Sequence, residues 1–245
     1  MTVAAPRQFE AYGPSYWGAI AVFVAGAVVL VWVGRRQSEE HSRRFGRIVG
    51  GLTAVIYVAV LVYSMFPPMI GRSVPLRLTD LATVAAACAL WSQRHWAFAL
   101  TYYWGLVLSA QALISPVLVG PDFPHYTFLA FWAIHLLVVW AAIYLTWGRG
   151  LRPSWRSLRL VLLVTAAWAV ITFVFNRIAG TNYGFLNGKP VTASLLDVLG
   201  PWPVYIVSAT ALIVIVWVAM TLPWVRVRGS RPHATMVPRS MCRGR

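Results

Sequence analysis

The stretch VPLRLTDLATVAAACAL, residues 74–90, decides how many times the chain can cross a membrane. Its second half is as apolar as a membrane helix, whereas its first half carries Arg77, Thr79 and Asp80. A charged side chain inside a bilayer is costly unless it has a partner or faces a protein-lined cavity. We therefore interpret the stretch as a short third span whose polar start faces the interior of a helix bundle.

The composition around this stretch is that of a polytopic membrane protein. Of the 245 residues, 59% are apolar and 11% are charged, whereas about 25% of a typical soluble domain is charged. A membrane helix needs about 20 apolar residues, and seven stretches meet or approach this length: residues 16–33, 49–66, 76–91, 96–114, 126–146, 158–175 and 202–222. The sequence thus predicts an all-α protein, with a seven-helix transmembrane bundle as a single domain over residues 1–225.

Basic residues lie mostly on one side of the predicted bundle. Of the 21 Lys and Arg residues, five fall on one side, and the rest follow the first, third and fifth spans or belong to the C-terminal tail. The loop after the first span is predicted to hold Arg35, Arg36, Arg43, Arg44 and Arg47. Because cytoplasmic loops carry the excess of Lys and Arg, the N-terminus is predicted outside and the C-terminus in the cytoplasm. This requires an odd number of spans, and residues 226–245 are predicted to be a disordered basic cytoplasmic tail.

Charge and cysteine content argue against several functions. The arginines behind the net charge of +15 flank apolar spans, so they do not indicate nucleic-acid binding. The two cysteines, Cys88 and Cys242, lie far apart in the chain, which makes a disulfide framework or a thiolate metal site implausible. One histidine and one carboxylate inside the spans are too few for zinc, which takes roughly three or four ligands. We predict no metal, no cofactor and no nucleic-acid partner, and we expect membrane lipids as partners.

Polar residues within the spans gather at the predicted outer side of the membrane. Four spans and the loop after the sixth span contribute the candidates, which are Arg77, Thr79, Asp80, Gln111, His135, Asn176, Asn182, Tyr183 and Lys189. His135 lies deepest, about 13 Å into the fifth span. Because polar groups in spans usually face the bundle interior, a common depth predicts one shared cavity that opens toward the outer leaflet.

Thr79 and His135 are the minimum for acyl transfer at this depth. The histidine would take the hydroxyl proton, and the threonine oxygen would attack an ester carbonyl. Asp80 could orient His135 or hold a lipid headgroup. The oxyanion could be stabilised by one of Arg77, Gln111 and Asn176.

Each candidate also has a purely structural interpretation. Thr79 could bond the carbonyl four residues before it, as threonine often does in membrane helices. Asp80 could pair with Arg77, three residues earlier. His135 could be a buried residue with satisfied hydrogen bonds, and the two amide side chains could join helices.

Five segments between residues 74 and 205 are distinctive: VPLRLTDLA (74–82), QALISP (111–116), FPHYTFLAFWAIH (123–135), FNRIAGTNYGFLNGKP (175–190) and SLLDVLGPWPVY (194–205). In this order they resemble the YwaF-type family of bacterial integral membrane proteins, which implies a multi-pass protein of the bacterial plasma membrane. That family is similar to a eukaryotic TMEM-type lipid acyltransferase and to the androgen-dependent TFPI-regulating-protein-like lipid hydrolases. The resemblance implies a membrane-embedded nucleophile and a histidine that act on lipid acyl esters.

The resemblance also selects two residues. The family's nucleophile is usually Cys within a Pro-Leu-His-x-Cys motif, which reads PLRLT at residues 75–79. A cysteine mechanism is therefore out of reach, whereas the related hydrolases use threonine. The family's histidine maps onto His135, so the resemblance implies Thr79 and His135, the pair that membrane depth also selects.

The connection over residues 181–203 fits either a lid or an ordinary interfacial loop. Gly184 and Gly188 permit positive φ, and three prolines set rigid corners. The function we expect is a membrane-embedded lipid-active enzyme. Two alternatives are a transporter that uses Asp80 and His135 as a proton pair and a non-catalytic assembly protein whose polar cluster fixes helix packing.

Overall fold

The computed structural model describes residues 7–190 and 194–229 of the chain. In these residues seven helical segments are long and apolar enough to cross a membrane. They are α1 (Pro14–Arg36), α2 (Glu39–Ser64), α3 with α4 (Ile70–Ser73 and Leu78–Ser92), α5 with η1 and α6 (His95–Tyr103, Trp104–Ser109 and Ala110–Ile114), α7 with η2 (Tyr126–Ile143 and Tyr144–Gly148), α8 (Trp155–Ala179) and α9 (Val204–Gly229). The predicted all-α fold with a seven-helix transmembrane bundle is confirmed.

Consecutive spans run in opposite directions, and alternate helix ends meet at one end of the bundle. The last turn of α1 lies against η2, where Gly34 and Gly148 are in close backbone contact. His95 Nε2 at the start of α5 lies 3.1 Å from Ser157 Oγ at the start of α8. We call this the basic end, because it carries the arginines of α1, α2, α8 and the α7–α8 link, and it is the predicted cytoplasmic side. The opposite end, the loop end, holds the long α8–α9 connection.

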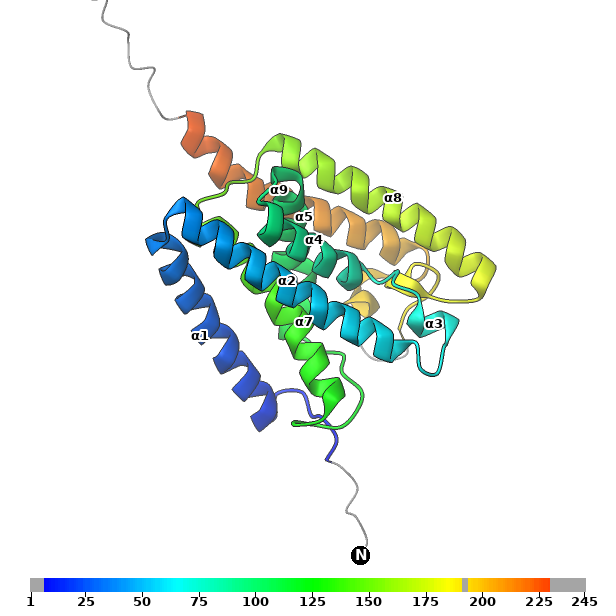
Figure 1. The fold of residues 1–245 in the computed structure, drawn as a ribbon. Helices are drawn as coiled ribbons and strands as arrows, with labels where there is room; N and C mark the ends of the chain where they lie inside the picture. The colour runs from blue at the N-terminus through cyan, green and yellow to red at the C-terminus, as the bar shows by residue number, and fades with distance from the viewer. Residues whose placement is uncertain (1–6, 191–193, 230–245) are drawn as a thin grey trace, which may run out of the picture.

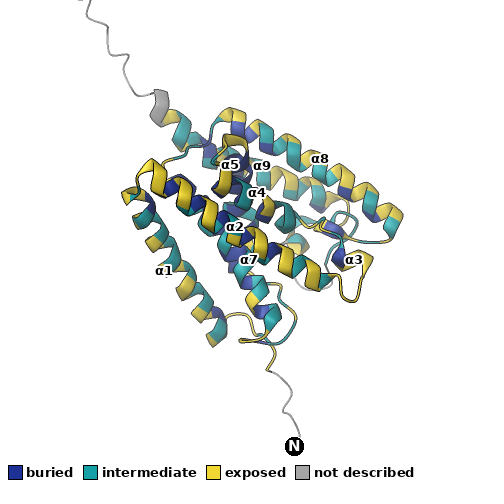
Figure 2. Ribbon diagram, in the orientation of Figure 1, coloured by how far each residue is buried: buried dark blue, intermediate teal, exposed yellow. Residues whose placement is uncertain are grey.

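The third, fourth and fifth spans form the centre of the bundle, and the other four surround them. The buried share of the most apolar window is 61% for the fourth span and 56% for the fifth, but 6% for α1 and 17% for α8 and α9. Figure 1 shows α1 on one side of the bundle and α8 on the other, and Figure 2 shows the buried residues concentrated between them. The outer helices therefore present most of their surface to lipid.

Glycines allow α2 to pack closely on α4. A Cβ atom on Gly46 would lie 2.4 Å from the carbonyl oxygen of Leu90, and one on Gly50 would lie 2.8 Å from that of Ala87. Small residues permit this close approach in membranes, where packing replaces the hydrophobic effect as the force between helices. The interface fixes α4, and hence its polar first turn, in the centre of the bundle.

The start of α2 corrects one sequence-based expectation. The helix begins at Glu39, ten residues before the predicted span, so Arg43, Arg44 and Arg47 lie on a helix and not in a loop. Ser38 is the cap, since its side chain accepts a hydrogen bond from the His41 N–H, and two glutamates follow in the first turn. Hydropathy marks only the part of a helix inside lipid, whereas capping sets where the helix begins.

The C-terminal end of the last helix corrects a second expectation, because this helix also extends beyond its predicted span. The last helix, α9, continues to Gly229, so the first four residues of the predicted tail are helical. The rest of the predicted tail lies outside the described residues.

Candidate functional site

The first turn of α4 explains how charges enter the third span. This helix has 15 residues, which at 1.5 Å per residue is about 22 Å, shorter than the ~30 Å hydrocarbon core. Asp80 accepts a hydrogen bond from the backbone N–H of Arg77 through Oδ2, at 3.0 Å. A carboxylate in this position caps the helix, and its negative charge interacts favourably with the positive end of the helix dipole. Among the described residues the two side chains form no ion pair, so the predicted pairing runs through the backbone.

Thr79 lies on the buried face of α4, three, four and seven residues before Ala82, Thr83 and Ala86, which are all 0–1% exposed. The carbonyl of Thr79 accepts a hydrogen bond from the Thr83 hydroxyl at 2.7 Å. The hydrogen bond to a carbonyl four residues earlier, which was one interpretation of Thr79, is instead made by the hydroxyl of Thr83. Within the described part of the chain, the Thr79 hydroxyl has no hydrogen-bond partner.

His135 is buried on α7, with 8% of its surface exposed. Its Nδ1 lies 2.7 Å from the carbonyl oxygen of Phe131, one turn earlier. Because a carbonyl only accepts hydrogen bonds, Nδ1 must carry the proton, which leaves the lone pair of the neutral ring on Nε2. Nε2 has no hydrogen-bond partner in residues 7–190 and 194–229. The ring therefore presents a free acceptor atom that can act as a base.

Thr79 and His135 lie at matching depths on helices that pack together. Thr79 comes 13 positions before Ser92 at the basic end of α4, and His135 comes 13 positions before Gly148 at the basic end of η2. At 1.5 Å per residue, both are about 20 Å from that end. No hydrogen bond joins the two side chains in the described residues, so depth and helix packing are what relate them.

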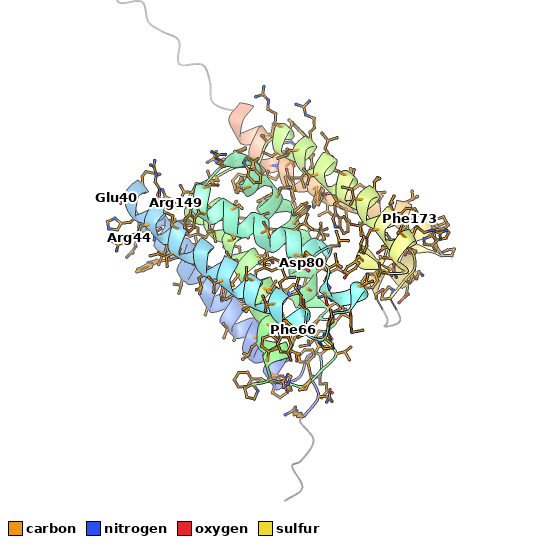
Figure 3. All side chains as sticks on the ribbon, turned by 45° about the vertical axis from the view of Figure 1, so that its right-hand side comes forward. Glu40, Arg44, Phe66, Asp80, Arg149 and Phe173 are labelled. Atoms are coloured by element: carbon orange, nitrogen blue, oxygen red, sulfur yellow. The ribbon has the colours of Figure 1, made fainter. Side chains whose placement is uncertain are left out.

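Asp80 belongs to a different place. It lies at one end of a groove of about 330 Å³ between α2, α4, α5 and α8, whose walls are otherwise almost entirely apolar. Tyr57 of α2 and Trp104 of η1 face Asp80's groove from the two sides, and neither Thr79 nor His135 lines it. Figure 3 shows Asp80 well away from Glu40, Arg44 and Arg149, which cluster at the basic end. The structure does not gather the predicted residues into one cavity.

Asn176 is the centre of a hydrogen-bonded knot in the α8–α9 connection. It is 2% exposed. Its Nδ2 donates to the Tyr183 carbonyl at 2.9 Å and to Asn187 Oδ1 at 2.8 Å. Its Oδ1 accepts from the Thr181 hydroxyl and from the Tyr183 N–H, both at 2.8 Å. The amide uses all four of its bonding positions to shape the loop and has none left for an oxyanion.

Tyr183 in η3 (Tyr183–Phe185) ties this loop to the third span. Its hydroxyl donates to the Ile70 carbonyl at 2.5 Å and accepts from the Val74 N–H at 3.2 Å. Burial raises the pKa of the Tyr183 phenol, so the proton that it donates is retained. Gly184, as predicted, has a positive φ of 67°. The connection is thus anchored on α3, directly above the start of α4.

The remaining candidates lie at the loop end. Asn182 is exposed and holds the loop through Gly188 and Asn187. Lys189 pairs with Asp197 of η4 (Leu195–Leu199) at 3.8 Å and lies 5.8 Å from the centre of the Tyr205 ring. Arg77 and Gln111 are exposed. In the described residues no three His, Cys, Asp or Glu side chains are placed to hold a metal ion.

Two features were not among the sequence-predicted site residues. Thr172 on α8 is fully buried, and its hydroxyl has no hydrogen-bond partner among the described residues. The π-helical segment η1 packs on α7 at Gly105, where a Cβ atom would lie 3.2 Å from the Val138 carbonyl. Such segments frequently occur at functional sites, but their hydrogen-bond register has no signature in a single apolar sequence.

Comparison with known proteins identifies the family. Residues 11–221 match the TMEM164 family, which is most of the chain, so the protein belongs to that family. No curated protein matches the chain. No solved structure matches it. The expected relationship to TMEM-type multi-pass membrane proteins is confirmed, whereas the YwaF-type assignment and the bacterial plasma membrane remain predictions.

Proposed function

We propose that this TMEM164 family protein is a membrane-embedded enzyme that transfers or hydrolyses the acyl group of a lipid ester, with Thr79 as nucleophile and His135 as base. The observation that carries the proposal is that each of the two side chains has one polar atom without a hydrogen-bond partner. The hydroxyl of Thr79 and Nε2 of His135 have no hydrogen-bond partner within the described chain. Thr79 is half-buried, and neither of the two atoms is fully enclosed by the described residues. Both can therefore be reached by a lipid, from helices that pack together.

The reaction needs only these two side chains and the lipid. His135 Nε2 removes the proton of Thr79 Oγ1 as this oxygen attacks the ester carbonyl carbon. The ester C–O bond then breaks, the proton passes from Nε2 to the leaving oxygen, and the lipid alcohol departs while the acyl group stays on Thr79. Attack by water or by a second alcohol, assisted by the same histidine, releases the acyl group as a fatty acid or as a new ester.

The other candidates receive supporting roles in this proposal. Arg77 is exposed at the loop end, where its guanidinium can hold the phosphate of a lipid headgroup. The α8–α9 connection is held by Asn176, Asn182, Tyr183 and Lys189, and the Tyr183 hydroxyl joins it to α3. Asp80 fixes the start of α4, and its committed carboxylate gives less support to a proton-coupled transporter that pairs it with His135.

The test uses three threonine variants. Thr79→Val removes the hydroxyl at constant shape, Thr79→Ser keeps a hydroxyl, and Thr83→Val removes the neighbouring hydroxyl that is committed to the Thr79 carbonyl. We expect Thr79→Val to lower release of fatty acid from phospholipid by at least about 100-fold. Intact mass after exposure to a fluorophosphonate or lactone probe should show adducts on wild type and Thr83→Val only, with Thr79→Ser partly labelled.

A histidine variant separates catalysis from folding. His135→Asn keeps a donor for the Phe131 carbonyl at the position of Nδ1 but removes Nε2. We expect folded protein with the same loss of turnover as Thr79→Val. If Thr79→Val and Thr83→Val were equally active, the threonine mechanism would be wrong and the assembly function would be favoured.

A further inference from the structure

A groove at the basic end lies between α1 and the fifth span, which consists of α7 and η2. Its volume is about 560 Å³, larger than the 330 Å³ of the Asp80 groove. Its floor is apolar, with Val28 and Val31 from α1 and Ile143 from α7. Its mouth is lined by two arginines and two tryptophans, Arg35, Arg36, Trp32 and Trp147.

The length of this groove matches one leaflet. It extends along α1 from Ala27 to Arg36, which at 1.5 Å per residue is about 14 Å. Half of the hydrocarbon core is about 15 Å. The tryptophans, 55% and 40% exposed, are at the headgroup level where this residue is enriched. The whole groove thus spans about one leaflet, with its apolar part toward the membrane centre and its cationic part at the membrane surface.

Both arginines keep donors available at the mouth. The guanidinium of Arg36 lies over the Trp32 ring, 4.1 Å from its centre, and stacking uses the face of the group while its N–H donors point outward in the plane. Arg35 donates through Nε to the Trp147 carbonyl at 3.2 Å. Its two terminal nitrogens remain available to donate hydrogen bonds to a ligand. A fixed pair of guanidinium groups with in-plane donors matches the oxygens of a phosphate.

No carboxylate neutralises this pair in the described residues. Glu39, which is near in sequence, forms an ion pair with Arg149 at 2.5 Å. Arg149 also donates to the carbonyls of Gly34 and Gln37, so this arginine fixes the corner between α1 and α2. Glu40 lies in the first turn of α2 and does not line the groove.

We infer that this groove binds one anionic phospholipid from the leaflet at the basic end, with its phosphate on Arg35 and Arg36 and an acyl chain along the α1 floor. Charge complementarity selects the ligand, because the cytoplasmic leaflet is anionic and basic pockets between membrane helices on that side bind such headgroups. The site is separate from Thr79 and His135, so it stands whether or not the protein is an acyl-ester enzyme.

The test compares two double variants by native mass spectrometry of the detergent-solubilised full chain, titrated with phosphatidylglycerol or phosphatidylcholine. Arg35→Ala with Arg36→Ala removes the proposed phosphate ligands. Arg43→Ala with Arg44→Ala removes the same charge from exposed positions on α2 at the same end. We expect the first pair to weaken retention of one phosphatidylglycerol by about 30-fold, and the second pair to change it less than about threefold.

Other outcomes overturn the inference. Equal losses in both double variants would mean general charge attraction. Equal retention of phosphatidylcholine, whose phosphate is balanced by choline, would mean that the groove does not select for an anionic headgroup. Displacement of phosphatidylglycerol by inorganic phosphate would indicate a free-anion site. Val28→Trp fills the groove from a position that is 65% exposed and leaves the arginines in place; unchanged binding in this variant would exclude an acyl chain on the floor.

Discussion

Asn176 and His135 are both buried polar residues on membrane-spanning helices, yet they use their hydrogen-bonding atoms differently. Asn176 forms four hydrogen bonds with the loop that follows it, two as donor and two as acceptor. In His135, Nδ1 forms a hydrogen bond within its own helix, and Nε2 has no partner among the described residues. Asn176 has no hydrogen-bonding position left for a ligand, whereas the second nitrogen of His135 remains available for one.

The same contrast is found among the arginines of the basic end. Arg149 is committed to Glu39 and to two backbone carbonyls. Arg35 makes one backbone hydrogen bond, and Arg36 stacks on a tryptophan. Identical side chains therefore have different roles a few ångströms apart, and net charge alone does not separate them.

The largest effect that would sharpen this comparison is expected for Asn176→Ala. The change leaves several buried partners of the amide unpaired, and each unsatisfied group costs ~1–3 kcal/mol. We expect the free energy of unfolding in detergent to fall by about 4 kcal/mol, measured by SDS titration. The control is Asn182→Ala, whose amide is exposed and makes two hydrogen bonds; equal losses in the two variants would remove the distinction between a saturated knot and a surface loop.

A smaller effect is expected for Tyr183→Phe. The change removes the hydroxyl that joins the loop to Ile70 and Val74, at a cost of about 2 kcal/mol. The matched control is Tyr12→Phe, which removes a single exposed hydrogen bond to the Ile114 carbonyl and should cost less than ~0.5 kcal/mol. Thermal unfolding of both variants in one detergent compares them directly, and a silent Tyr183→Phe would show that the loop is not anchored on α3.

Controls aside, the smallest effect on stability is expected for His135→Asn. The Phe131 carbonyl keeps a donor, and only part of the ring volume is lost, so the cost should be about 1 kcal/mol. The same SDS titration measures it. A loss as large as that of Asn176→Ala would mean that the ring holds structure, which would contradict the role proposed for its second nitrogen.

The sequence alone determined the all-helical class and the number of spans. Backbone groups in lipid must be satisfied within their own segment, so a long apolar stretch specifies a helix locally, and seven such stretches specify seven helices. The early start of α2 was also readable, because Ser38 followed by two glutamates is a local capping signal. The choice of Thr79 and His135 came from depth and resemblance, which are likewise sequence properties, and their catalytic role stays a prediction.

Only the tertiary structure decided which polar groups have hydrogen-bond partners and which do not. The Tyr183 hydroxyl meets a carbonyl 113 residues away, and the Asp80 carboxylate turns to the backbone of its own helix instead of joining His135. Asn176 is saturated because the chain folds back after α8, and the two arginines at the end of α1 form a mouth because η2 packs against that helix. Hydropathy acts within one segment, whereas hydrogen-bond partners and grooves arise between segments, and their identity depends on packing that no single segment encodes.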